Sequence, residues 1–87
     1  MNSKKVGICG TMESNDCLVT VKKNDLGKNE INITSIVDDF YHDEILACVK
    51  EVLKEFNLND VTVDLNDKGA LDFTIKARVK TAIERMN

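Results

Sequence analysis

The residue best suited to chemistry in this sequence is Ser14, in residues 10–16 with the sequence G-T-M-E-S-N-D. This stretch has neither helical nor strand periodicity, and its short polar side chains are of the kinds that bond to neighbouring backbone groups in turns. We therefore expect Ser14 on an exposed turn, between the carboxylates of Glu13 and Asp16. By residue type alone it is a turn or capping serine. The sharper hypothesis is that its hydroxyl is an attachment point for a carried group.

The remaining residues of catalytic type do not form a recognisable site. His42 is the only histidine, and no H-x-x-x-H, C-x-x-C or Ser-His-Asp spacing surrounds it, so we expect an exposed helix residue. The three cysteines leave one over after any pairing, which indicates neither a disulfide framework nor a zinc site. Cys9 and Cys17 are expected to pack beneath the Ser14 turn, and Cys48 on a buried helix face. We therefore predict no catalytic residues, no metal and no enzyme activity of its own.

Composition limits the partners that this chain can take. It has 87 residues with 43% apolar and 31% charged side chains, as expected for one globular domain spanning residues 1–87. The net charge of −3 gives no electrostatic support for binding nucleic acid, and no run of apolar residues approaches membrane length. Reduced thiols without an export signal indicate the cytoplasm. Residues 30–56 carry a net charge of −5, which suits either a basic partner or the solvated face of a helix.

Two predicted strands and a predicted helix must position the turn that contains Ser14. Residues 17–22 and 30–36 alternate apolar and polar side chains, which predicts two strands joined as an antiparallel hairpin. Residues 40–56 then place apolar side chains at steps of three and four, which predicts an amphipathic helix. That stripe consists of Ile45, Cys48, Val49, Val52, Leu53 and Phe56.

The second half of the chain repeats this pattern. Residues 61–65 and 71–77 predict two further strands, joined by a hairpin turn at 66–69 in which Gly69 takes a positive φ. A short helix from residue 78 would follow, although the apolar residues from 71 onward also fit one long helix. The predicted fold class is α+β: two ββα units forming a four-stranded antiparallel sheet, with two helices packed on one face. Residues 1–8 are expected to be a frayed N-terminus. In the unmodified protein, the turn that contains Ser14 is expected to be among the most mobile parts after the termini, because few apolar side chains anchor it.

Two separated motifs add a family resemblance. Residues 9–16, C-G-T-M-E-S-N-D, resemble the A-G-T-L-E-S-x-D stretch of the citrate lyase acyl carrier proteins, the gamma chains of that complex. Residues 66–72, N-D-K-G-A-L-D, resemble a second stretch of the same family, which is followed by its Arg-containing tail at Ala77-Arg78. The resemblance runs from about residue 6 to residue 86 with matching order and separation. Its departures are mild, with Cys9 in place of Ala and Met12 in place of Leu.

The resemblance implies that Ser14 carries a phosphoribosyl dephospho-coenzyme A group through a phosphodiester bond. The thiol of that group would hold acetyl and then citryl units while citrate is cleaved to acetate and oxaloacetate. The implied partners are the alpha and beta chains of citrate lyase and the transferase that attaches the group. Two alternatives stay open: the similar carrier of malonate decarboxylase, and an α+β interaction or small-ligand regulatory domain without a carried group.

Overall fold

The computed structural model describes residues 5–36 and 41–86, in which four strands and two helices follow one another as β-β-β-α-β-α. The elements are β1 (Val6–Gly10), β2 (Cys17–Lys23), β3 (Glu30–Ser35), α1 (His42–Glu55), β4 (Val61–Asp67) and α2 (Asp72–Glu84).

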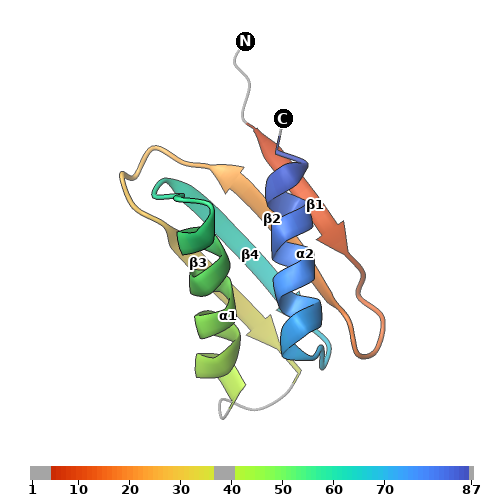
Figure 1. Cartoon of the computed structure of the whole chain (residues 1–87). Helices are drawn as coiled ribbons and strands as arrows, with labels where there is room; N and C mark the ends of the chain where they lie inside the picture. Colours follow the sequence, from red (N-terminus) through yellow and green to blue (C-terminus); the bar gives the residue numbers. More distant parts are fainter. Residues whose placement is uncertain (1–4, 37–40, 87) are drawn as a thin grey trace.

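The four strands form one sheet with the order β1-β2-β4-β3. β2 is antiparallel to both β1 and β4, whereas β3 runs parallel to β4. Both helices lie side by side over one face of this sheet (Figure 1), with α2 packed on β1 and β2 and α1 against β3. The expected α+β fold, with a four-stranded sheet covered on one face by two helices, is confirmed. The expectation that every strand pair is antiparallel needs correction, because β3 and β4 are parallel.

The predicted hairpin between residues 17–22 and 30–36 is wrong, because β4 lies between these strands in the sheet. β4 places Val61, Val63 and Leu65 in the core, each at most 2% exposed. β4 is hydrogen-bonded along both of its edges, to β2 on one side and to β3 on the other. The loop after β2 therefore carries the chain past β4 to the edge position, where β3 pairs in parallel.

The predicted strand at 71–77 is also wrong, because these residues belong to α2. Ile75, Val79 and Ala82 are buried at helical spacing, which was the alternative interpretation of this segment. Residues 66–69 consequently close no hairpin and instead connect β4 to α2. The positive φ expected at Gly69 is confirmed, at +94°.

The fourth strand comes from the N-terminal segment, so the order of two ββα units is not observed. Val6–Gly10 forms β1 and pairs with β2 from Val6↔Lys22 to Gly10↔Leu18. The expectation of a frayed segment is therefore wrong for residues 6–8, while residues 1–4 lie outside the described residues.

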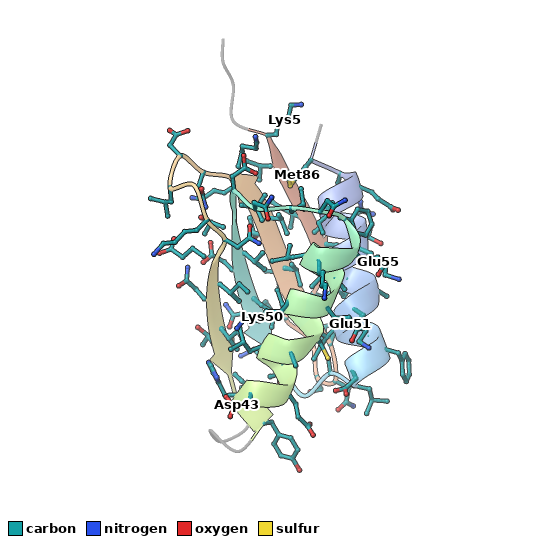
Figure 2. The ribbon with its side chains drawn as sticks, turned by 60° about the vertical axis from the view of Figure 1, so that its left-hand side comes forward. Lys5, Asp43, Lys50, Glu51, Glu55 and Met86 are labelled. Atoms are coloured by element: carbon teal, nitrogen blue, oxygen red, sulfur yellow. The ribbon has the colours of Figure 1, made fainter. Side chains whose placement is uncertain are left out.

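The helix expected at 40–56 is observed as α1, His42–Glu55. Its buried residues are those of the predicted stripe apart from Phe56, which is partly buried: Ile45, Cys48, Val49, Val52 and Leu53. Figure 2 shows charged side chains along this helix, among them Asp43, Lys50, Glu51 and Glu55, all exposed. The acidic segment is thus partly the solvated side of α1, although residues 37–40, with two of its carboxylates, lie outside the described residues.

We expect Gly69→Val to lower the free energy of unfolding by about 1–2 kcal/mol, because a side chain at positive φ clashes with its own backbone. A Cβ at Gly69 would lie no closer than 3.6 Å to any neighbouring atom, Asn15 Oδ1, so the loss reports the backbone conformation and not crowding. Urea denaturation of Gly69→Val beside Lys68→Val, whose φ is not positive, would measure it. Equal effects of the two substitutions would contradict the assignment.

Candidate functional site

Ser14 lies in the loop between β1 and β2, residues 11–16, which we call the Ser14 turn. Figure 1 shows this turn at the same end of the molecule as the β4–α2 loop and the N-termini of both helices. The Ser14 side chain is exposed, as predicted, and no group of the described residues hydrogen-bonds to its hydroxyl. The hydroxyl is therefore accessible from solvent.

The carboxylate of Asp16 anchors the Ser14 turn to α2. Arg78 donates from Nε to Oδ1 at 2.9 Å and from Nη2 to Oδ2 at 3.0 Å, a two-pronged ion pair. Thr11 Oγ1 donates to Oδ2 at 2.8 Å, and the Cys17 amide donates to Oδ1 at 2.7 Å. The two guanidinium–carboxylate bonds fix the orientation of the Asp16 side chain as well as its distance from Arg78. Because Asp16 also binds both ends of the turn, it sets where they lie relative to α2.

These bonds favour the ionised form of Asp16. The Arg78 guanidinium and, with smaller effects, the Thr11 hydroxyl and the Cys17 amide lower its pKa from 3.8 to about 2, against a partial opposing effect of burial. The same ion pair raises the pKa of Arg78. The side chain of Asp16 is 14% exposed, which shields the pair from water more than an ordinary surface pair.

Backbone hydrogen bonds hold the turn from its other side. Asn15 N donates to Lys68 O at 2.8 Å, and Lys68 N donates to Asp16 O at 2.9 Å, which extends the pairing of β2 with β4 beyond Cys17. Asn15 takes a left-handed conformation with φ of 67°, which asparagine tolerates better than most residues. Polar contacts therefore anchor this turn where few apolar side chains do, so we now expect it to be less mobile than the sequence suggested.

The turn begins at a position that only glycine can occupy. Gly10 has a φ of +105°, and a Cβ there would lie 1.8 Å from Cys17 O. Beneath it Cys9 and Cys17 are buried, as predicted. Burial, followed by the charges of Asp16 and Asp67, raises the pKa of Cys17 to about 12. This thiol therefore stays protonated and covered, whereas the Ser14 side chain nearby is exposed.

The other predicted candidates do not join Ser14. His42 begins α1 with a side chain 49% exposed and its Nδ1 3.7 Å from Asp43 Oδ1, in agreement with an exposed helix histidine. Cys48 is buried in the core, where burial raises the pKa of its thiol. Within residues 5–36 and 41–86 no group of three or more His, Cys, Asp or Glu side chains could hold a metal ion.

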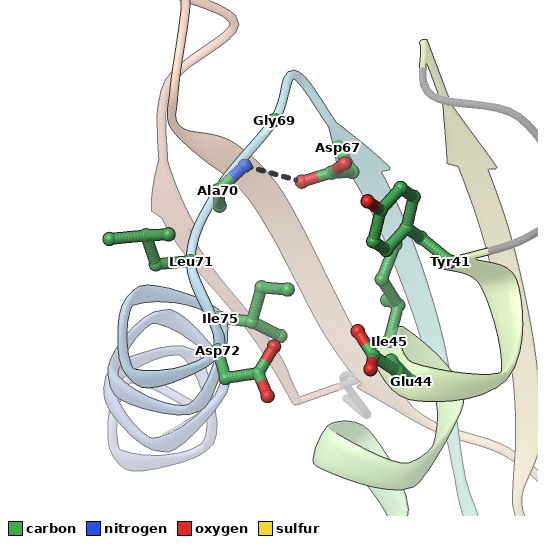
Figure 3. A pocket seen from close by; sticks show the side chains of 9 residues that line it. All are labelled: Tyr41, Glu44, Ile45, Asp67, Gly69, Ala70, Leu71, Asp72 and Ile75. Atoms are coloured by element: carbon green, nitrogen blue, oxygen red, sulfur yellow. Dashed lines mark hydrogen bonds between the residues drawn. The ribbon is translucent and has the colours of Figure 1, made fainter.

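A pocket beside the turn was not predicted from the sequence. It lies between the first turns of α1 and α2 and has a volume of about 270 Å³ (Figure 3). Its lining comes from three segments that only the fold brings together: Tyr41, Glu44 and Ile45; Asp67, Gly69, Ala70 and Leu71; and Asp72 and Ile75. Arg78 was noted in sequence only as part of the family's tail, and nothing in the sequence indicated its bond to Asp16.

Comparison with known proteins places this chain in a family. A family model described as the malonate decarboxylase delta subunit (MdcD) matches residues 4–86. The citrate lyase acyl carrier protein of Treponema denticola is 44% identical over 87 residues, covering 100% of this chain and 98% of that protein. Its counterpart in Clostridium perfringens is 42% identical over 85 residues, covering 98% of this chain and 84% of that protein. This chain belongs to the citrate lyase acyl carrier protein family. As a member it is a carrier subunit and not a catalyst.

Solved structures agree with this carrier family in fold. One chain in a crystal structure of a Pseudomonas malonate decarboxylase hetero-tetramer in complex with malonate superposes with a TM-score of 0.83 at 17% identity, covering 95% of this chain and 84% of that one. The Staphylococcus aureus RNase P protein is a looser likeness, with a TM-score of 0.55 at 11% identity, and shows shared architecture alone. Among the described residues of this carrier, no helix is long and apolar enough to cross a membrane.

We expect Asp16→Asn to lower the free energy of unfolding at pH 7 by about 1–3 kcal/mol, since it removes the charge that Arg78 and two other donors bind. The pKa of Asp16 is lower in the folded protein than its ordinary value, so the stabilisation by its charge is complete well above pH 3.8. It disappears as the pH falls through 3.8 to about 2, where the carboxylate is protonated in both states. Urea denaturation of both proteins at pH 7, 5 and 3 would measure the difference.

Asp43→Asn is the matched control, because the Asp43 side chain is 98% exposed. Its effect should stay within about 0.5 kcal/mol at each pH. A difference between the wild type and Asp16→Asn that does not shrink between pH 5 and pH 3 would contradict the role given to the Asp16 charge.

Proposed function

We propose that this chain is the acyl carrier subunit of citrate lyase and that Ser14 carries a phosphoribosyl dephospho-coenzyme A arm through a phosphodiester bond. The observation that carries the proposal is an exposed serine hydroxyl on a preformed turn, in a chain whose relatives are named citrate lyase acyl carrier proteins. When attached, the arm supplies a thiol that holds acetyl and citryl units as thioesters during cleavage of citrate to acetate and oxaloacetate.

The residues around Ser14 fit such a group. Its side chain is exposed and lies in a loop outside the strands, so a bulky substituent on its oxygen displaces no core side chain. The turn itself is held by Asp16, Asn15 and Thr11, none of which needs the Ser14 hydroxyl. The attachment point therefore keeps its conformation whether or not the arm is present.

The contribution of the protein is to position the arm. A thioester tethered to Ser14 reaches each partner's active site at a high effective concentration, which free diffusion would not provide. The partners on this proposal are the alpha and beta chains of citrate lyase, and the transferase that attaches the arm. We place the complex in the cytoplasm, without a role for nucleic acid, membrane or metal.

A second candidate is the carrier of malonate decarboxylase. The description of the matching family model and the structural likeness to the Pseudomonas hetero-tetramer favour it. Identities of 42% and 44% to citrate lyase carriers over nearly the full chain, against 17% for that tetramer chain, favour citrate lyase. Membership of a carrier family leaves the third interpretation, a regulatory domain without a carried group, with no observation in its favour.

We expect protein from the native host to show a mass increment equal to the arm, which Ser14→Ala abolishes. Citrate cleavage by the reconstituted complex should fall to background with Ser14→Ala, because the thiol is no longer tethered. Intact mass spectrometry and an oxaloacetate assay would measure both, and the unmodified chain alone should release no oxaloacetate.

His42→Ala and Ser35→Ala serve as controls that should leave the mass increment in place, and His42→Ala should also leave citrate cleavage nearly unchanged. Retention of the increment in Ser14→Ala would show that another residue carries the group. Cleavage of malonyl thioester but not of citryl thioester by the native complex would assign the chain to malonate decarboxylase.

A further inference from the structure

The pocket between α1 and α2 opens beside the Ser14 turn. Gly69 lines it, and a Cβ on Gly69 would lie 3.6 Å from Asn15 Oδ1. The residue before Gly69, Lys68, exchanges two backbone hydrogen bonds with Asn15 and Asp16, at 2.8 and 2.9 Å. The loop that forms one wall of the pocket is thus the loop that holds the turn, so a group attached to Ser14 begins next to this pocket.

Hydrogen bonds to Asp67 hold one side of the pocket in place. Asp67 is 2% exposed, and its carboxylate accepts hydrogen bonds from Ser35 Oγ at 2.8 Å and from Ala70 N at 2.9 Å. The first bond ties the end of β4 to the end of β3, and the second ties it to the loop leading into α2. Ile45 and Ile75, buried at 4% and 1% exposure, provide aliphatic surface behind it.

Charge limits what this pocket can hold. Three of its nine lining residues are carboxylates, namely Glu44, Asp67 and Asp72, and no lysine or arginine is among the nine. Phosphate groups and the free carboxylates of a citryl unit would be repelled there, since like charges at short range are unfavourable. A neutral group with hydrogen-bond donors is favoured, because the exposed Glu44 and Asp72 carry acceptor oxygens.

The shape of the pocket further limits the kind of ligand that it can hold. The aromatic ring of Tyr41, 46% exposed, lies near the end of β4, with Ile45 next to it on α1 and Ile75 across the pocket on α2 (Figure 3). A ring beside aliphatic side chains suits a flat aromatic group, which gains from stacking as well as burial. Typical small-ligand pockets measure about 300–1,000 Å³, so a volume of about 270 Å³ accommodates one ring system and not a whole arm.

We propose that this pocket binds the adenine base of the arm, with the base against Tyr41 and its exocyclic amino group donating to Glu44 or Asp72. The inference rests on the proposed attachment at Ser14. Adenine is the one flat, uncharged ring system of a phosphoribosyl dephospho-coenzyme A group. Its phosphates are excluded by the carboxylates, and its thiol end must leave to reach the partner active sites. Holding the base fixes the inner part of the arm and leaves the pantetheine part to move.

The test uses free nucleosides on the unmodified protein, so it does not depend on attachment. In ¹⁵N-resolved NMR titrations, adenosine should shift the amide resonances of Ile45, Gly69 and Ala70. Inosine, which lacks the exocyclic amine, should bind about tenfold more weakly, the effect of one hydrogen bond to a charged acceptor. Tyr41→Ala should weaken adenosine binding severalfold, while Phe73→Ala, at an exposed aromatic (72%) outside the pocket lining, should not.

A second measurement uses native protein whose mass confirms the arm. Nuclear Overhauser contacts are then expected between the adenine protons and the methyl groups of Ile45 and Ile75. An arm present by mass without these contacts would overturn the pocket assignment while leaving the carrier function intact, whereas native protein without the arm would overturn the carrier function itself. Equal binding of adenosine and inosine would also overturn the assignment. So would shifts of the pocket amide resonances with S-acetyl-N-acetylcysteamine, which reproduces the acylated thiol end of the arm, and not with adenosine.

Discussion

The structure around the serine depends on one interaction, the bond between Asp16 and Arg78, which joins residues 62 positions apart. It ties a loop between two strands to the helix that ends the chain, and the carboxylate also accepts bonds from both ends of the same loop. A carrier has to present a reactive group without burying it. Here polar bonds to the neighbours of Ser14 hold the loop in place, so the serine can stay exposed on a fixed support. Apolar anchoring of the same loop would have drawn its side chains, and with them the serine, toward the core.

The sequence predicts an element of this fold well where the signal for it is local. It predicts an element poorly where that element depends on a partner far away in the sequence. The stripe from Ile45 to Leu53 is a local signal, and it predicted α1 to within two residues at each end. The segment at 71–77 contains apolar residues that satisfy both periods, and the turn-like residues before it favoured the strand, although they lead into a helix. β1 was missed because V-G-I-C-G carries two glycines, which lower strand propensity, and gains its stability from pairing with β2 and packing under α2. Strand order was beyond local pattern altogether, since it is set by hydrogen bonds between segments far apart in the sequence, such as those of β2 and of β3 with β4.

The candidate site likewise has one part that the sequence predicted and another that only the fold brings together. Ser14 and its exposure were predicted, because turn residues act within a few positions of each other. The support of Ser14 was not, because Arg78 and Lys68 reach the turn only once α2 and β4 are in place. The pocket requires three separate segments to meet at one end of the sheet, and its residues are individually unremarkable in sequence. The two stretches that resemble the citrate lyase carriers, residues 9–16 and 66–72, contact each other in the fold through the two backbone hydrogen bonds of Lys68.

The central claim, that a preformed turn presents an otherwise unengaged serine, is tested most directly by amide hydrogen exchange on the unmodified protein. The account predicts protection of the Asn15 and Cys17 amides, which are bonded to Lys68 O and Asp16 Oδ1, on either side of a rapidly exchanging Ser14 amide. Arg78→Leu should remove protection in the turn while Val19 and Val63 in the central strands keep theirs. Exchange of every amide from Thr11 to Asp16 at the rate of an unstructured peptide in the wild type would contradict it.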